Sequence, residues 1–167
     1  MVGRTSAEAV HHFIEPLQRA LSCVTDAVIH VSSGYFPRAE PHGAELSENP
    51  AALRTRGSNS IHLFVTISYV IEHVDGREPW RVRVTGHNFT LDDSSRREIL
   101  AYHWHPVGVS AVTMPHLHLG PGALVGRDEL RVAHLPTGAV ALADVIRLAI
   151  TDFGVVPRRA DWAAVLQ

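Results

Sequence analysis

The sequence predicts an α+β fold, an antiparallel β meander with an N-terminal helix and C-terminal helices packed on it. Two observations lead to this prediction. Apolar residues recur at helical spacing near both ends of the chain, over 6–24 and 141–153. Between them, from residue 60 onward, apolar and polar residues alternate with the period of a half-buried strand.

The N-terminal helix is predicted over residues 6–24. Thr5 and Glu8 form a capping-box pattern ahead of the apolar stripe. Pro16 interrupts the stripe, so we expect a kinked helix or two short helices. The stripe consists of Val10, Phe13, Ile14, Leu17, Leu21 and Val24. A short strand is expected over 26–32.

Residues 33–60 are predicted to form a long loop, with a short helix around 50–54, inside a single domain that spans 1–167. Glycine and proline recur along this stretch, which favours turns over regular structure. Long loops in small domains are commonly functional or mobile. The residues concerned are Gly34, Pro37, Pro41, Gly43, Pro50 and Gly57.

The central meander begins with a long strand over 60–71, in which every second residue is apolar: Ile61, Leu63, Val65, Ile67, Tyr69 and Ile71. Asp75 and Gly76 mark a hairpin turn. The return strand starts at Trp80, and Gly86 is a candidate bulge because the apolar phase shifts beyond it. A turn at 92–95, a strand over 97–105 and a short strand over 115–120 complete the meander.

The C-terminal part is predicted to hold a weak strand over 132–135, a helix over 141–153 that ends at Gly154, and a short helix over 160–166. The 141–153 helix is apolar almost all round. Such a helix is either buried or pairs with another chain, so a homo-oligomer through it is one expectation.

Composition excludes several classes of protein. The chain has 167 residues, 46% hydrophobic and 19% charged, which excludes a disordered chain or a fibre. No apolar run approaches the roughly 20 residues of a membrane span, and charged residues near the N-terminus argue against a signal peptide. Cys23 is the single cysteine, so an internal disulfide framework is excluded and a cytoplasmic protein is expected.

Charge gives no support to a broad nucleic-acid-binding surface. The net charge is −2, and all 15 basic residues are arginine. The absence of lysine excludes Schiff-base chemistry and a phosphate-binding loop that needs lysine.

Histidine carries the functional signal. Of the 12 histidines, four lie within one short stretch as two His-x-His motifs, His103 with His105 and His116 with His118. On a strand, residues i and i+2 point to the same face about 6.5–7 Å apart. Two such pairs on neighbouring strands would place four imidazoles on one patch.

The register of the hairpin that leads into the first pair can be argued from the apolar pattern. If Trp80 and Val82 share the core face with Leu100 and Tyr102, the histidine pair lies on the opposite, polar face. A slip of one residue would bury two imidazoles without partners, which is costly. The preferred register pairs Val84 with Trp104, Arg83 with His105, and Thr85 with His103.

Three interpretations of the cluster remain open. Two to four of these histidines can ligate zinc or another divalent transition metal, with Asp92, Asp93 or Asp128 as further ligands. They can perform metal-free acid–base cleavage of a phosphodiester, with Arg83 neutralising the phosphate. They can also be structural side chains on an exposed strand face.

Three sequence segments also resemble a known family. They are Ala101–Pro106 (AYHWHP), Met114–His118 (MPHLH) and Leu142–Ile146 (LADVI). In this order they make residues 97–152 similar to the TumE-like toxins of bacterial toxin–antitoxin pairs. The resemblance implies an intracellular toxin that acts on RNA and is neutralised by an antitoxin protein.

The predicted function is therefore a histidine-dependent endoribonuclease or metal-assisted hydrolase. Its site residues are His103, His105, His116 and His118, with Arg83 facing the phosphate. The alternative is a non-catalytic metal-binding or partner-binding module that uses the same histidines as ligands.

Overall fold

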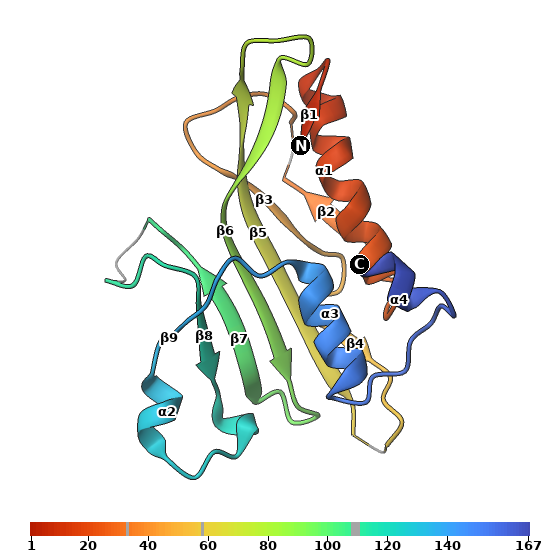
Figure 1. The fold of residues 1–167 in the computed structure, drawn as a ribbon, viewed down its shortest axis with the longest axis vertical. Helices are drawn as coiled ribbons and strands as arrows, with labels where there is room; N and C mark the ends of the chain where they lie inside the picture. The colour runs from red at the N-terminus through yellow and green to blue at the C-terminus, as the bar shows by residue number, and fades with distance from the viewer. Residues whose placement is uncertain (33, 58, 108–110) are drawn as a thin grey trace.

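The computed structural model describes residues 1–32, 34–57, 59–107 and 111–167. It has the predicted α+β architecture, with α1, α3 and α4 together against a large antiparallel sheet and the short α2 apart from them, beside β8 (Figure 1). The strand order is β2-β3-β5-β6-β7-β8-β9, with β1 added beside β6 and β4 beside β5. The core lies between the sheet and the helices α1 and α3.

The helices are α1 (Ser6–Leu21), α2 (Asp128–Val132), α3 (Leu142–Thr151) and α4 (Trp162–Val165), with a 3₁₀ turn η1 at Pro121–Ala123. The strands are β1 (Val2–Gly3), β2 (Ile29–Val31), β3 (His42–Leu46), β4 (Ala51–Leu53), β5 (Ile61–His73), β6 (Trp80–Asp92), β7 (Glu98–Trp104), β8 (His116–Leu119) and β9 (Leu135–Pro136).

Helix α1 forms where the apolar stripe predicts it. The Thr5 hydroxyl accepts a hydrogen bond from the Glu8 backbone N–H at 3.1 Å, which caps the helix. Pro16 lies inside a single continuous helix, so the expectation of two helices is wrong. The carbonyl that loses its donor to Pro16 belongs to His12, which is exposed, so water can satisfy it.

The predicted loop at 33–60 is a second correction. Two strands lie within it, β3 and β4, and both pair with β5. Residues 51–53 are a strand rather than the expected helix. Both strands are short and alternate between buried and exposed residues. The flanking prolines and glycines concealed this alternation, and pairing with the long β5 supplies the stability that the local sequence lacks.

The β5–β6 hairpin confirms the alternation predicted for 60–71, the turn at Asp75–Gly76 and the bulge near Gly86. The pairing register shifts between Ser68 and Tyr69, which face Gly86 and Val84. Thr85 is therefore the extra residue of a β-bulge in β6, with no partner opposite it on β5. The shift keeps Val82 before the bulge and Phe89 beyond it on the same core face.

The register expected between β6 and β7 is wrong by three residues. His103 lies opposite Asn88 instead of Thr85, and Trp104 lies opposite His87 instead of Val84. The tight connection decides this, because the Asp93 carboxylate accepts hydrogen bonds from two backbone N–H groups of the turn that follows it. The face is as predicted, since His103 alternates with the core residues Leu100 and Tyr102 of β7 and so points away from α1 and α3.

The C-terminal elements complete the layer of helices. Helix α3 confirms the apolar prediction for 141–153, and five of its residues are buried against α1 and β6: Leu142, Val145, Ile146, Ala149 and Ile150. Packing within one chain thus accounts for this surface, and the homo-oligomer stays a prediction. Residues 128–132 form α2, which the sequence did not predict, and the strand expected at 132–135 is the two-residue β9.

Candidate metal centre

The histidine cluster is built by β7 and β8, which are neighbours in the sheet. His103 and His116 lie directly opposite each other across the antiparallel ladder. His118 follows two residues along β8 and so shares the face of His116, while His105 lies one residue beyond the end of β7 with its ring against His103 and His116. The prediction that the four histidines share one surface is confirmed.

The imidazole rings are in mutual contact. The ring centroids of His103 lie 5.7 Å from His116 and 4.9 Å from His118, and those of His116 and His118 are 4.9 Å apart. His105 lies 5.4 Å from His116 and 5.8 Å from His103.

His116 has the environment of a metal ligand. Its side chain is 1% exposed, and its Nδ1 lies 2.7 Å from the Met114 carbonyl oxygen. A carbonyl can only accept, so Nδ1 carries the proton and Nε2 of the neutral ring keeps a lone pair. A backbone carbonyl that fixes the tautomer in this way is the usual partner of a ligating histidine.

Two of the ring nitrogens are buried without a partner. Among the described residues, neither Nε2 of His116 nor Nε2 of His103 has a hydrogen-bond partner. A buried polar atom of this kind costs free energy unless something binds it. A metal ion is one such ligand.

Two histidines of the cluster are held in the neutral form, which can bind a metal cation. Burial, together with the nearby histidines, lowers the pKa of His103 to about 4. Burial also lowers the pKa of His118, and His134 and His116 beside it act in the same direction. Both rings are therefore neutral at pH 7, which is the form that binds metal.

Three ligand atoms already converge. One ring nitrogen from each of His103, His116 and His118 lies within 4.8 Å of the other two. Tetrahedral zinc at about 2.0–2.1 Å from each nitrogen needs ligands about 3.4 Å apart, so side-chain movements of roughly an ångström would complete the site. The carboxylates Asp92, Asp93 and Asp128 do not belong to this group.

A fifth histidine was missed by the sequence analysis. The His134 ring lies 4.4 Å from His118 and 5.0 Å from His116, and the residue is exposed. It lies just ahead of β9, the strand that pairs with β8. A two-residue strand leaves almost no periodic signal, so only the pairing places His134 beside the cluster.

Arg83 is not part of the site, which corrects its predicted place opposite His105. Its guanidinium bonds the Glu72 carboxylate at 2.7 Å, and its strand position faces Val70. Asn88, the partner of His103, lies five positions further along β6, a distance of roughly 16 Å at the usual rise per residue. The metal-free phosphodiester mechanism thereby loses its predicted phosphate-binding arginine.

We expect Arg83→Ala to leave metal affinity unchanged within about twofold and to lower the free energy of unfolding by less than about 1 kcal/mol. The reason is that an exposed ion pair contributes little to stability. Calorimetric metal titration and urea unfolding of the variant test both numbers. A tenfold loss of metal affinity would place Arg83 functionally in the site after all.

The stability of the metal-free protein is expected to fall as pH is lowered from about 6.5 toward about 4. Burial lowers the pKa of His87 and His103 to about 4 in the folded protein, whereas both titrate near 6.5 in the unfolded chain. Below pH 6.5 the unfolded chain therefore binds more protons than the folded one. Each histidine then contributes a slope of up to about 1.4 kcal/mol per pH unit.

Urea unfolding at several pH values measures that slope. His87→Phe should flatten it, whereas the exposed His30→Ala should not. An unfolding free energy that is constant from pH 7 to pH 4.5 would contradict the expectation.

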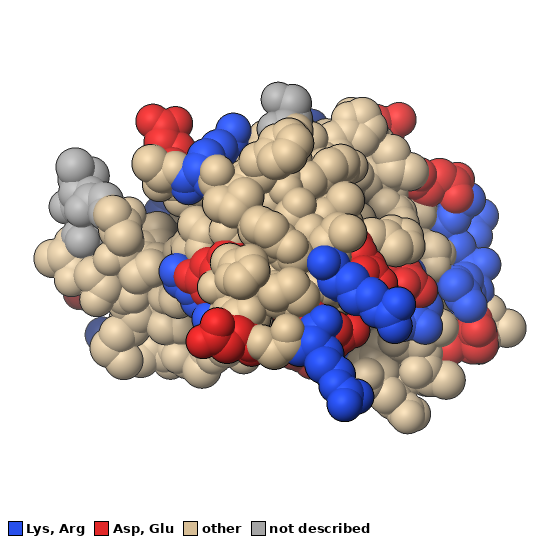
Figure 2. All heavy atoms as spheres, turned by 90° about the horizontal axis from the view of Figure 1, so that it is seen from above, with Lys and Arg blue, Asp and Glu red and all other residues tan. Residues whose placement is uncertain are grey.

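Surface charge is mixed. Figure 2 shows basic and acidic side chains interspersed on the face that it presents. Several charged side chains of the protein form ion pairs, such as Arg81 with Glu72 and Arg97 with Asp93. This pattern agrees with the net charge of −2 and adds nothing in favour of an RNA-binding surface.

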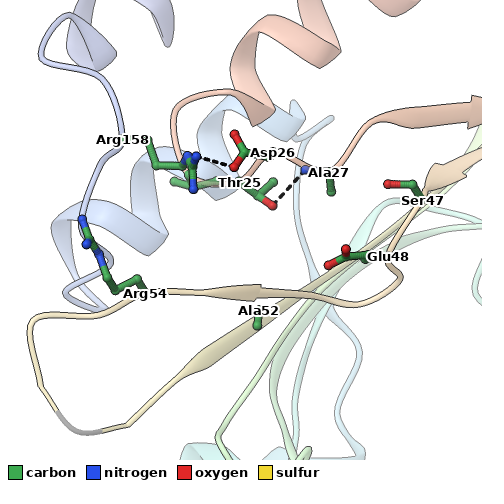
Figure 3. Close-up of a pocket in the computed structure, with 9 residues that line it drawn as sticks. Thr25, Asp26, Ala27, Ser47, Glu48, Ala52, Arg54 and Arg158 are labelled. Atoms are coloured by element: carbon green, nitrogen blue, oxygen red, sulfur yellow. Dashed lines mark hydrogen bonds and ion pairs between the residues drawn. The ribbon is translucent and has the colours of Figure 1, made fainter.

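A separate polar cavity of about 610 Å³ lies between the α1–β2 connection and β4 (Figure 3). Asp26 and Arg158 form an ion pair in it, and the Thr25 hydroxyl accepts a hydrogen bond from the Ala27 N–H at 3.1 Å. Its lining combines two acidic residues, Asp26 and Glu48, with two basic ones, Arg54 and Arg158, and includes no histidine. The candidate chemistry therefore stays with the cluster on β7 and β8.

None of the helices in the described ranges is long and apolar enough to cross a membrane. Comparison of the chain with protein-family models, with curated proteins and with solved structures finds no significant match. The resemblance to TumE-like toxins thus stays a prediction, and the site has to be interpreted from its own geometry.

Proposed function

We propose that this protein binds one divalent transition metal ion, with zinc as the first choice, through His103, His116 and His118. The observation that carries the proposal is the convergence of three imidazole nitrogens within 4.8 Å of one another. Two of the contributing rings, those of His103 and His116, hold buried Nε2 atoms that make no hydrogen bond within the described part of the chain.

The donor set favours zinc, copper or nickel over magnesium or calcium. All three donors are imidazoles, which suit borderline transition metals, whereas magnesium and calcium prefer oxygen. Strand geometry holds the donors on one face, and the Met114 carbonyl orients the most buried ring. The site is thus organised before the ion arrives, which lowers the cost of binding.

Three protein ligands leave one tetrahedral position free. In catalytic zinc sites that position holds water, which the metal activates as a Lewis acid for hydrolysis. His134 and His105 lie beside the three ligands and can exchange protons with a group bound there. We therefore propose metal-assisted hydrolysis as the reaction class.

Metal content of the purified chain tests the proposal. The protein should be made without a polyhistidine tag, which would itself bind metal, and analysed by mass spectrometry after growth with added zinc. We expect about one zinc per chain, and competition with a chromophoric chelator should give its affinity.

The double variant His103→Ala/His118→Ala should lose the metal. The matched double variant His11→Ala/His30→Ala removes two exposed histidines and should keep it. Less than a tenth of an equivalent of any transition metal, with no thermal stabilisation on adding zinc, would refute the site.

RNA is the first substrate to assay, because of the resemblance of residues 97–152 to TumE-like toxins. Cleavage that is lost with chelator and restored by zinc would support a metal-dependent nuclease. Cleavage that survives chelator and follows a bell-shaped pH profile would favour the metal-free mechanism instead.

A further inference from the structure

A second cavity, of about 330 Å³, lies on the other face of the sheet from the histidine cluster. It is enclosed by α1, by β5, β6 and β7, and by the segment that leads into α3. The pairing of His87 with Trp104 puts both side chains on the core-facing side of the sheet, away from His103.

The floor of the cavity is core and its rim is open. Phe13, Ile67 and Phe89 are buried, whereas Ala139 and Ala141 at the rim are exposed. The two alanines are too small to fill the space. Apolar core surface is thus left facing a hollow that an apolar molecule could fill with a gain in buried area.

Aromatic side chains form the walls of this cavity. The His87 ring stacks on Phe89, with centroids 4.6 Å apart and ring planes at 6°, and lies 5.9 Å from the Trp104 ring. Aromatic walls of this kind favour a flat aromatic guest through offset or edge-to-face contacts.

His87 is the titratable group of a lining that is otherwise apolar, apart from the indole N–H of Trp104. Neither of its ring nitrogens has a hydrogen-bond partner among the described residues, in contrast to His42 or His116, which bond backbone carbonyls. Burial lowers the pKa of His87 to about 4, so at pH 7 the neutral ring offers one donor and one acceptor.

We propose that this cavity binds a small, uncharged aromatic molecule that carries one hydroxyl group, with the rings against Phe89 and Trp104 and the hydroxyl on His87. A neutral imidazole complements a hydroxyl, which both donates and accepts. A carboxylate would bring a charge into an apolar space without a cation to pair it, so it is disfavoured.

The probe for the test is 2-naphthol, titrated into ¹⁵N-labelled full-length protein at pH 7 with chelator present, so that the metal site plays no part. We expect saturable shifts of amide signals from residues 84–89 and 139–142 and of the Trp104 indole N–H. A dissociation constant of about 10–300 μM suits a ligand of this size. The matched anion 2-naphthoate should bind at least tenfold more weakly.

Two variants locate the binding. Ala139→Trp places a large ring over the rim and should weaken 2-naphthol at least tenfold, whereas Ala7→Trp, at an exposed position of α1, should not. His87→Phe keeps a flat ring but removes the hydrogen bond, so it should weaken 2-naphthol about three- to tenfold and leave naphthalene unchanged.

Binding that saturates in the wild type and follows this pattern supports the proposal. No saturable shift up to 1 mM, or equal affinity in the wild type and a folded Ala139→Trp variant, would overturn it. Since chelator is present throughout, either outcome leaves the proposed metal site untouched.

Discussion

Replacing His116 with alanine should lower zinc affinity at least about 100-fold, which is about 2.7 kcal/mol of binding free energy. His116 is the most buried of the three proposed ligands, and its ring is already held by the Met114 carbonyl. Its loss leaves only two of the three converging nitrogens. Chelator competition of wild type and variant measures the difference.

Stability should respond differently with and without metal. In the metal-free protein, the cavity left by the ring is offset by removal of an unpaired buried nitrogen, so we expect a change within about 1 kcal/mol. With zinc at 1,000 times the wild-type dissociation constant, the wild type should gain about 4 kcal/mol that the variant lacks. His30→Ala, the exposed control, should behave as wild type in both conditions.

A His116→Ala protein that still binds zinc within tenfold of wild type would show that His116 is not a ligand. A metal-free variant that loses several kcal/mol would instead show that the ring is a structural core group. The two results are distinguishable because one is read from affinity and the other from unfolding.

Gly120→Ala should lower the free energy of unfolding by about 3 kcal/mol. A Cβ at this position would lie 2.3 Å from the Glu98 carbonyl oxygen and 2.7 Å from its carbonyl carbon. Backbone atoms cannot turn aside as a flexible side chain can, so β7 would have to move away from the end of β8. Overpacking of this kind commonly costs about 1–3 kcal/mol.

The same change should weaken the metal site, because Gly120 follows β8 two residues after His118 and its N–H donates to the Ile99 carbonyl of β7 at 3.0 Å. Gly126→Ala is the matched control, since a Cβ there meets nothing within 4 Å. Urea unfolding and zinc titration of both variants provide the test. Equal stability of the two variants would mean that β7 and β8 do not approach as closely as the structure shows.

Some of the fold could be predicted because its signals are local. The alternation from Ile61 to Ile71, the turn at Asp75 and the stripe of the first helix each depend on neighbours in sequence. Hydrophobic periodicity and turn-forming residues act over a few neighbouring positions, so they can be recognised in the sequence directly. The same holds for the buried face of α3, where apolar residues recur at helical spacing.

The strands at 42–46 and 51–53 could not be predicted in this way. They are short, glycine or proline lies in or beside them, and they are strands because β5 is long enough to pair with both. The register between β6 and β7 depended on the hydrogen bonds of one turn, to which Asp93 contributes. Such contacts are formed only when the segments meet.

The sequence by itself determined that four histidines would lie on one polar strand face, because two His-x-His motifs on adjacent strands leave few other arrangements. Tertiary structure decided the rest of the site. Sheet pairing added His134 through β9 and moved Arg83 away from the cluster to Glu72. Alternation along one strand follows from backbone geometry, whereas the register between strands depends on turns, bulges and cross-strand packing that no local pattern encodes.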